Sequence, residues 1–238
     1  MARVGGPSPE VGRLRARLVV RQVRRRVQRV RTPARSWQAT LGPFGLDGQE
    51  LLLRAPQFED ADAWQEARLY NREWLEPWWP VSGRPWEQAQ SPLEWVAYCS
   101  GIRASARVGQ AMPFAVIVNG ALRGQCGIDA VDRGTNTGEI SMWMDQRSRV
   151  RGAATLAAAA VSRFALTCPE AVDRVVAPIS TTNRAANLLA TRTGFTLEGT
   201  LRRYRPTSEG RADHNIWCLH RDPETITALT ALVDSLQR

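Results

Sequence analysis

The sequence predicts an α+β fold built on a mixed, mostly antiparallel central sheet that is flanked by helices. Three features support this fold class. Residues 114–126 hold two apolar, strand-like segments around an Asn-Gly pair, a favoured two-residue hairpin turn. Residues 137–166 run from a strand through an arginine-rich turn into an alanine-rich helix, and residues 195–220 form a second hairpin. Strands paired mainly by hairpins, with helices between them, indicate an α+β domain.

The elements of the N-terminal half follow from local signals. Residues 51–55, Leu-Leu-Leu-Arg-Ala, predict the first strand. A helix is expected to start within residues 58–63, where acidic side chains fall in the first turn. Ser91 has capping-box spacing to Glu94, with proline at the first helical position, so a second helix should run to about residue 108.

The C-terminal half alternates strands and helices. Residues 137–144 predict a third antiparallel strand, and residues 152–166 the alanine-rich helix. Residues 175–179 form a short apolar run typical of a buried strand. A further helix is expected over residues 183–194, which end in glycine, and a terminal helix starts at Pro223.

The 238 residues divide by composition. We expect an arginine-rich tail at residues 1–35, a Gly/Pro-punctuated linker at 36–45, one domain at 46–222 and a C-terminal helix at 223–238. The tail carries 11 arginines and one acidic residue, whereas the rest of the chain carries 21 arginines and 22 acidic residues. The net charge of +9 therefore belongs to the tail, and the nearly neutral domain argues against nucleic acid as the domain's own substrate.

The tail has an amphipathic pattern. Val20, Val23, Val27 and Val30 recur at helical spacing among arginines. Such a basic amphipathic helix would suit ribosomal RNA or an anionic membrane surface. A disordered basic extension, or a start codon assigned too early, explains the same composition.

The cysteines and histidines give little indication of a metal site or a redox-active cysteine pair. The four cysteines are widely spaced and form no C-x-x-C pair, and there are only two histidines, so we expect no metal site. Reduced, buried thiols are typical of a cytoplasmic protein. No apolar run approaches the ~20 residues that cross a bilayer.

The turn at residues 147–155 is the strongest functional signal. It places arginines beside the start of a helix, where unpaired backbone N–H groups and the helix dipole bind phosphate groups. An ordinary strand-to-helix connection is the alternative interpretation.

This turn and a second segment resemble the GNAT superfamily of acetyl-CoA-dependent N-acetyltransferases. That family has a pyrophosphate loop of the form [Q/R]-x-x-G-x-[G/A], and later N-x-x-[S/A], a helix and G-F-x-x-E-G. The matching positions are Arg147, Val150, Gly152, Asn183, Ala186, Gly194, Phe195, Glu198 and Gly199.

Other segments are similar to the ribosomal-protein N-terminal acetyltransferases of the RimJ/RimL type. These are residues 71–80, which contain Leu-Glu-Pro-Trp-Trp-Pro, together with residues 201–204, residues 210–213 and Trp217. The likeness spans about residues 46–221. It implies acetyl-CoA as co-substrate and the N-terminal α-amine of a protein, plausibly a ribosomal protein, as acceptor.

Three positions depart from the family pattern. Val150 replaces the first glycine of the loop, Ala186 replaces a serine that can protonate the leaving thiolate, and Arg205 stands where some relatives have a carboxylate. Two alternatives therefore stay open: a small-molecule amine acetyltransferase, and a catalytically degenerate module that binds acyl-CoA.

Acetyl transfer needs a group that removes a proton from the attacking ammonium. Glu139, on the strand before the loop, is the expected base, and His214 is the alternative because of its intrinsic pKa. Asp213 is expected either to bind the substrate amine or to brace its strand.

The resemblance also implies which residues bind each substrate. In the superfamily, the strand before the loop splays from its neighbour and holds the pantetheine arm. The residues expected to contact acetyl-CoA are Met142, Trp143, Met144, Arg147, Arg149, Val150, Arg151, Gly152, Ala153, Ala154, Thr155, Asn183 and Asn187. The residues expected to form the acceptor side are Trp74, Leu75, Trp78, Trp79 and Asp213. The tryptophans could instead cap the core.

Overall fold

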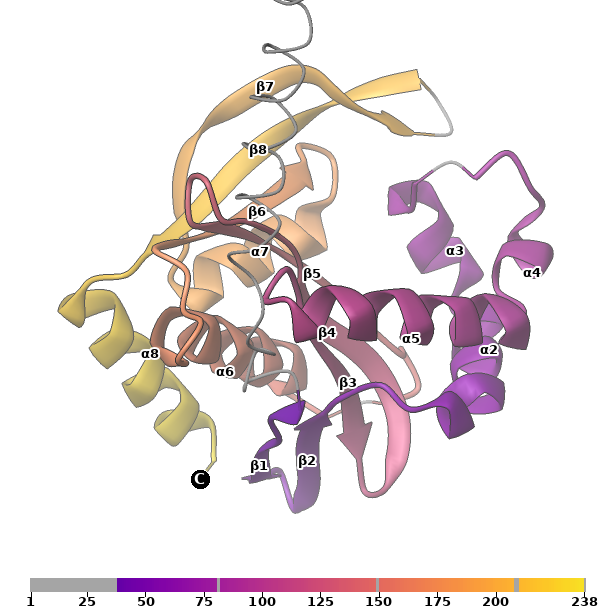
Figure 1. The fold of residues 1–238 in the computed structure, drawn as a ribbon, viewed down its shortest axis with the longest axis horizontal. Helices are drawn as coiled ribbons and strands as arrows, with labels where there is room; N and C mark the ends of the chain where they lie inside the picture. The colour runs from indigo at the N-terminus through magenta and orange to yellow at the C-terminus, as the bar shows by residue number, and fades with distance from the viewer. Residues whose placement is uncertain (1–37, 81, 149, 208–209, 238) are drawn as a thin grey trace, which may run out of the picture. The chain divides into compact units, whose positions relative to one another are not determined.

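A computed structural model describes residues 38–80, 82–148, 150–207 and 210–237. It confirms the predicted α+β fold: eight strands form one sheet in the order β1-β2-β3-β4-β5-β6-β8-β7 (Figure 1). Every neighbouring pair is antiparallel except β5 and β6. The strands are β1 (Leu41–Leu46), β2 (Gln49–Arg54), β3 (Met112–Val118), β4 (Ala121–Asp132), β5 (Thr137–Met144), β6 (Arg174–Ser180), β7 (Thr196–Thr207) and β8 (Gly210–His220).

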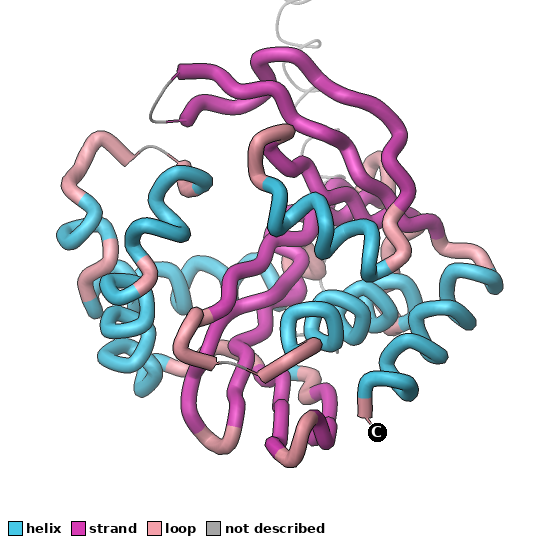
Figure 2. The backbone as a smooth tube through the Cα atoms, turned by 180° about the vertical axis from the view of Figure 1, so that it is seen from behind, coloured by secondary structure: helices cyan, strands magenta, loops and turns pink. Residues whose placement is uncertain are grey.

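Helices cover both faces of this sheet, as Figure 2 shows from behind. Helices α2 and α5 lie on one face and α6 on the other, and α8 packs against α6 at the side of the molecule (Figure 1). The helical segments are η2 (Phe58–Asp60), α2 (Ala61–Tyr70), α3 (Arg72–Leu75), η3 (Glu76–Trp78), α4 (Trp86–Ala89), α5 (Pro92–Arg107), α6 (Ala153–Thr167), α7 (Arg184–Thr193) and α8 (Pro223–Leu236).

The core has two parts because β3 is buried on both faces. Phe114 and Val116 pack in the cluster that includes α6, whereas Ala115 and Ile117 pack with Trp64 of α2 on the opposite face. Alternate side chains of a strand point to opposite faces, which explains why this strand is apolar throughout.

Strand β1 occupies residues that composition assigned largely to a linker. Gly42 and Pro43 suggested a loop, yet residues 41–46 pair with β2 and bury Phe44 and Leu46. A shift in register between Leu41 and Phe44 accommodates the glycine and proline. The C-terminal helix begins at Pro223 as expected, with Asp222 as its cap: Asp222 Oδ1 accepts a hydrogen bond of 2.7 Å from Thr225 N.

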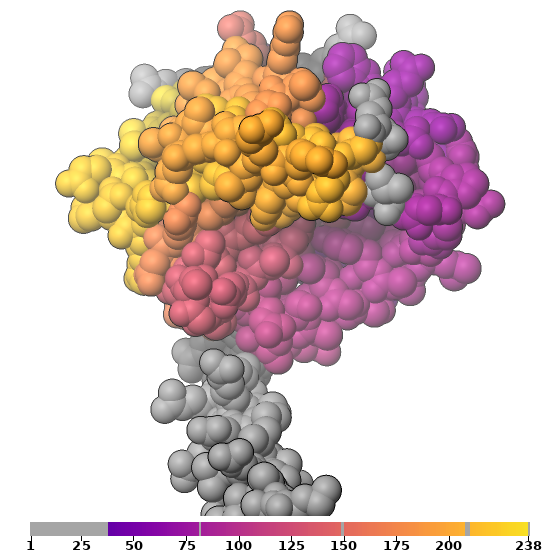
Figure 3. Space-filling view, turned by 90° about the horizontal axis from the view of Figure 1, so that it is seen from above, coloured from indigo at the N-terminus to yellow at the C-terminus, as the bar shows by residue number. Residues whose placement is uncertain are grey.

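The β7–β8 hairpin crosses one end of the molecule. In Figure 1 it reaches from the side of α8 toward the side of α3 and α4, and Figure 3 shows it as a ridge of orange and yellow atoms. Its strands extend beyond β6, which pairs with β8 only over residues 214–220. The hairpin can therefore contact elements that are not its neighbours in the sheet.

The expected tail, residues 1–35, lies outside the described residues. Within the described part of the chain, the four cysteines are buried and form no disulfide with one another. No helix there is both long enough and apolar enough to cross a bilayer.

Candidate active site

The sheet opens between β5 and β6. These strands pair in parallel only at Thr137–Arg174, Gly138–Val175 and Glu139–Val176. Beyond Glu139, β5 continues to Met144 and β6 to Ser180, each paired only with its other neighbour. The predicted splay of the strand that carries Met142, Trp143 and Met144 is confirmed. Backbone N–H and C=O groups along this gap are available to a bound molecule.

Helix α6 starts just beyond the end of β5 and points its first turn at the same region. Gly152 caps the helix in the left-handed conformation, with φ of 86°, which glycine adopts at no steric cost. The helix begins at Ala153, whose side chain is buried, and Ala154 and Thr155 are partly exposed. The first N–H groups of a helix have no partner within it, so this turn offers donors and a partial positive charge.

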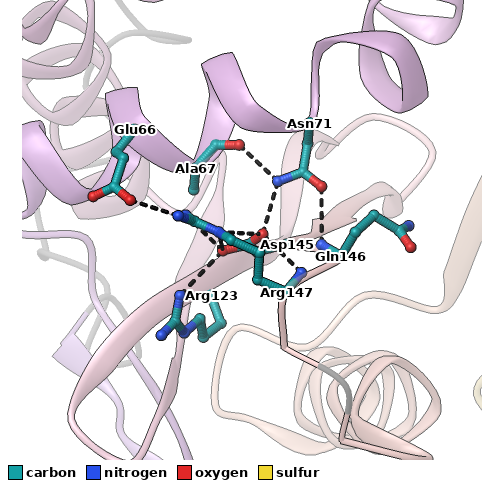
Figure 4. A network of polar contacts seen from close by, with 7 residues as sticks. All are labelled: Glu66, Ala67, Asn71, Arg123, Asp145, Gln146 and Arg147. Atoms are coloured by element: carbon teal, nitrogen blue, oxygen red, sulfur yellow. Dashed lines mark hydrogen bonds and ion pairs between the residues drawn. The ribbon is translucent and has the colours of Figure 1, made fainter.

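The loop before α6 is held by a buried carboxylate, shown in Figure 4. The side chain of Asp145 is 0% exposed and accepts hydrogen bonds from Asn71 Nδ2 at 2.8 Å and from Arg147 Nε at 3.0 and 3.1 Å. Arg123 adds a longer contact of 3.2 Å. Burial acts to raise the pKa of Asp145, but the hydrogen bonds from Arg147 and Asn71 outweigh it and hold the pKa below its usual value.

Asn71 stands between α2 and α3 and links this loop to α2, which lies on the face of the sheet opposite α6. Besides its bond to Asp145, its Oδ1 accepts a hydrogen bond of 2.9 Å from Gln146 N, and its Nδ2 donates to Ala67 O at 2.7 Å. The buried pair Asn71 and Asp145 thus fixes where the turn before α6 begins.

The structure distributes the predicted loop residues among different roles. The guanidinium of Arg147 binds Asp145 and Glu66 and stacks on Tyr70, 4.7 Å from the ring centroid, so its side chain serves the loop itself. Hydrogen bonds to Asp145 and then Glu66 raise the pKa of Arg147 above its usual value. Val150 is buried in the apolar core. Arg151 is exposed, and Arg149 lies outside the described residues.

Glu139 lies at the last paired position of β5, where the gap begins. Its Oε2 accepts a hydrogen bond of 2.6 Å from Arg205 Nη2 of β7. An ammonium approaching Glu139 would therefore compete with a guanidinium for the same carboxylate. This contact joins the predicted base to the position where some relatives have a carboxylate of their own.

The other two candidates on β8 have structural partners. His214 is buried against Tyr204, with ring centroids 5.7 Å apart, and its Nδ1 lies 3.0 Å from Ala212 O. Asp213 Oδ1 accepts a hydrogen bond of 2.7 Å from the backbone N–H of Arg203, which has a positive φ of 51°. Of the two predicted roles for Asp213, bracing its strand is the one with a visible contact.

The two asparagines of the N-x-x-[S/A] segment hold helix α7. Asn183 caps it, because its Oδ1 accepts a hydrogen bond of 3.1 Å from Ala186 N. Asn187 Nδ2 donates to the carbonyls of Ser180 and Asn183. Its Oδ1 accepts from Asn215 Nδ2 and Trp217 Nε1, both at 2.9 Å. An amide has two donors and two acceptor sites, so the side chain of Asn187 has no capacity left for a ligand.

The tryptophan segment is a chain of short helical turns with a largely exposed aromatic surface. Trp74 is 61% exposed, Trp78 42% and Trp79 37%, and Leu75 is partly buried. Trp86, later in the same segment, is buried, whereas the exposure of Trp74, Trp78 and Trp79 disfavours the alternative that they cap the core.

A buried arginine packs against the inner side of this aromatic surface. Arg68 of α2 is completely buried, and its guanidinium carbon lies 3.6 Å from the ring centroid of Trp79 and 4.7 Å from that of Trp86. Its Nε donates to Gln90 Oε1 at 2.8 Å. Burial lowers the pKa of Arg68 to about 9. Contacts between a cation and aromatic faces replace a carboxylate partner here and fix the orientation of Trp79.

Sequence reasoning missed the residues that hold the site together. Asn71, Asp145 and Arg68 look like ordinary polar positions in the sequence, and the partners that link them to other elements lie 22 to 75 residues away. The only local signal was Asp145 at the end of an apolar strand, directly before the arginine-rich turn. Among the residues described, no group of three or more His, Cys, Asp or Glu side chains is placed to hold a metal ion.

Comparisons with known proteins agree with this geometry. The family described as an acetyltransferase (GNAT) domain matches residues 50–196. RimJ of Mycobacterium smegmatis, solved with a CoA disulfide, is 30% identical, with a TM-score of 0.76 over 82% of this chain and 95% of that one. No curated protein matches the sequence.

More distant structures share the fold. The ribosomal-protein-S5-alanine acetyltransferase of Vibrio fischeri is 18% identical, with a TM-score of 0.65 over 73% of this chain and 94% of that one. The microcin C7 self-immunity acetyltransferase MccE, solved with acetyl-CoA and AMP, is 19% identical, with a TM-score of 0.64 over 76% and 98%. The chain belongs to the GNAT acetyltransferase family.

Proposed function

We propose that this protein transfers the acetyl group of acetyl-CoA to the N-terminal α-amine of a protein, by direct attack in a ternary complex. The observation that carries the proposal is the gap between β5 and β6, which opens beside the N-terminus of α6. The gap accommodates an extended arm with amide groups, and the N-terminus of α6 attracts a pyrophosphate. Their combination suits CoA better than either feature alone.

The backbone around the start of α6, in particular at Ala154 and Thr155, would bind the pyrophosphate through N–H groups, whereas the N–H of Ala153 already donates to Val150 O at 3.2 Å. The free edge of β5 at residues 142–144 would pair with the amides of the pantetheine arm. Trp143 itself is buried and bonds Gln125 Oε1 at 2.8 Å, so its contribution is a fixed backbone rather than a contacting side chain.

The reaction requires little covalent assistance. The amine nitrogen forms a bond to the thioester carbonyl carbon, the C–S bond breaks, CoA leaves as its thiolate, and the nitrogen loses a proton to the thiolate or to water. A thiol pKa near ~8.5 makes this leaving group stable enough to depart without a dedicated acid. Ala186, which stands where relatives have a serine, is compatible with transfer for this reason.

The acceptor is proposed to be a protein N-terminus, plausibly that of a ribosomal protein. RimJ of Mycobacterium smegmatis, at 30% identity, and the exposed surface of Trp74, Trp78 and Trp79 support this substrate class. Rigid apolar surface orients a short peptide end well, since few rotamers are lost on binding. The arginine-rich residues 1–35 are proposed to add affinity for ribosomal RNA, and the site of action is proposed to be the cytoplasm.

Release of CoA from acetyl-CoA tests this function. The full-length protein is incubated with acetyl-CoA and separate panels of N-terminal peptides and small amines. Multiple turnovers with peptides support the proposal. Turnover with small amines alone would identify a small-molecule acetyltransferase, and CoA binding without turnover on either panel would identify a degenerate binding module.

A further inference from the structure

Asp129 is an extra residue in β4 at the point where the gap begins. Ile128 pairs with Ile140 and Ala130 pairs with Glu139, so Asp129 has no partner on β5 and forms a β-bulge. Bulges redirect one side chain and recur beside active sites. The last paired residue of β5 toward β6 is Glu139, which places this bulge level with the opening of the sheet.

The side chain of Asp129 points to the face that carries α2 and α5. Ser141 donates a hydrogen bond from its hydroxyl to Asp129 Oδ2. Residues two apart on a strand share a face, and Trp143 packs with Trp64 and Trp95 on the α2 and α5 side. Asp129 and Ser141 are both exposed to solvent, so an incoming amine can reach the carboxylate.

The groups around Asp129 carry little positive charge. Its titratable neighbours are Glu139 on β5, Tyr98 on α5 and Cys126 on β4. Beyond the effect of reduced hydration, the charge of Glu139 raises the pKa of Asp129, and the charge of Asp129 raises the pKa values of Tyr98 and Cys126. Arg205 of β7 approaches the cluster but binds Glu139. The side chain of Asp129 stays open to solvent, but the protein atoms around it reduce its hydration, which raises its pKa; the negative charge of Glu139 adds to the rise, and the hydrogen bond from Ser141 opposes it.

We propose that Asp129 is the general base of the reaction, an inference that rests on the proposed function. The Asp129 carboxylate takes one proton from the substrate ammonium and becomes a neutral carboxylic acid. The neutral amine then attacks the thioester carbon, the C–S bond breaks with its electron pair on sulfur, and the second proton of the attacking nitrogen passes to the departing thiolate, so that CoA leaves as its thiol. Ser141 orients the carboxylate through its hydrogen bond.

Asp129 suits this role better than Glu139 for a geometric reason. Glu139 already holds a guanidinium at 2.6 Å, and a second cation at that carboxylate must displace Arg205 or share it. The described hydrogen bond to Asp129 comes from a neutral hydroxyl, which can rotate when an ammonium arrives. Glu139 and Arg205 then form the wall beside the reacting amine.

The test compares Asp129→Asn with Asp132→Asn, Ser141→Ala and Glu139→Gln. Asp132 is an exposed carboxylate on the same strand, with hydrogen bonds only to the following turn at Gly134 and Thr135. Acetyl-CoA affinity measured by calorimetry reports on folding. Turnover on an N-terminal peptide is followed from about pH 6 to about pH 9.5, a range that spans the usual pKa of an α-amine.

We expect Asp129→Asn to lower kcat at neutral pH by ~10²–10⁴ and to leave acetyl-CoA affinity unchanged. Activity should recover as the pH rises above about 8, because the amine then arrives neutral. Ser141→Ala should cost less than Asp129→Asn, and Asp132→Asn should match the wild type.

An Asp129→Asn variant that binds acetyl-CoA and keeps kcat within threefold at neutral pH would overturn the inference, as would a loss of activity that is equal at every pH. Either result leaves the proposed function standing if the wild type acetylates peptides. A wild type that acetylates no amine fails the proposed function instead.

Discussion

Arg205 of β7 donates a hydrogen bond of 2.6 Å to Glu139 of β5, although β6 and β8 lie between these two strands in the sheet. The contact exists because the β7–β8 hairpin extends past the end of β6 and crosses over the molecule (Figure 1). This contact brings a strand that is distant in the sheet order beside the start of the gap.

The phosphate site is tested most cleanly at Ala154. We expect Ala154→Asp to weaken CoA binding more than tenfold, because a carboxylate would repel the pyrophosphate at the start of α6. The same carboxylate favours the helix dipole, so folding should be preserved. Ala154→Asn is the matched neutral control. Calorimetry that finds equal CoA affinity for the two variants would contradict the site.

Gly152 is a less useful position for this test. A Cβ there would lie 3.3 Å from Leu236 Cδ2, and the glycine has φ of 86°. A substitution would strain the backbone and disturb the packing of α8, and an acidic side chain would enter apolar surroundings rather than the phosphate path.

The buried Asp145 should make loop stability depend on pH. Asp145→Asn should lower the free energy of unfolding at pH 7 by about 1–3 kcal/mol, since it removes a charged acceptor from Arg147 and Asn71. The folded-state pKa of Asp145 lies below its usual value, so its stabilisation is present above the unfolded pKa of ~3.9 and is lost as pH falls through the folded pKa.

Urea denaturation of the wild type and Asp145→Asn at several pH values checks this prediction. The difference between them should be constant above about pH 5 and should shrink toward about pH 3. A difference that grows with acidity would show that another group dominates, and no difference at pH 7 would remove Asp145 from the account of the loop.

The exposed tryptophans should matter for the acceptor and little for folding. We expect Trp74→Ala, at a side chain 61% exposed, to change stability by no more than about 0.5 kcal/mol but to raise KM for a peptide roughly tenfold. The KM for acetyl-CoA should stay unchanged. Leu93→Ala is the matched control, because Leu93 is a 78% exposed apolar residue on α5. Equal effects of the two variants on peptide KM would contradict a specific acceptor surface.

The arginine-rich segment should be dispensable for chemistry. Deleting residues 1–35 should leave turnover on short peptides within a few-fold, because the matched family domain covers residues 50–196. The deletion should weaken ribosome binding and flatten its dependence on salt, since arginine contacts with phosphates release counterions. Cosedimentation at two salt concentrations measures this. Ribosome binding that is insensitive to both salt and deletion would leave the segment without the proposed role.

The fold could be predicted from local signals, whereas much of the site could not. Asn119-Gly120, the Ser91 cap and the strand–turn–helix unit at residues 137–166 each fix an element by their own sequence, and the structure confirms them. β1 was missed because Gly42 and Pro43 look like a loop until β2 supplies a partner. A strand at the edge of a sheet is defined by its pairing, which sequence composition does not reveal.

The site depends on contacts between distant residues. Glu139 was located on the correct strand, but its pairing with Arg205 arises from the curvature of a hairpin 66 residues away. The bulge at Asp129 depends on the register of β4 against β5, which a one-residue shift would erase. Neither the register nor the curvature follows from the residues of one strand.

The proposed acceptor is a protein α-amine. A peptide that carries both a free N-terminus and an internal lysine, incubated with the protein and acetyl-CoA, distinguishes an α-amine from a side-chain amine. Fragmentation mass spectrometry then locates the acetyl group. The account predicts acetyl on the N-terminal nitrogen and none on the lysine, and no modification of the same peptide when its N-terminus is blocked. Acetylation of the lysine alone, or of neither amine, would contradict it.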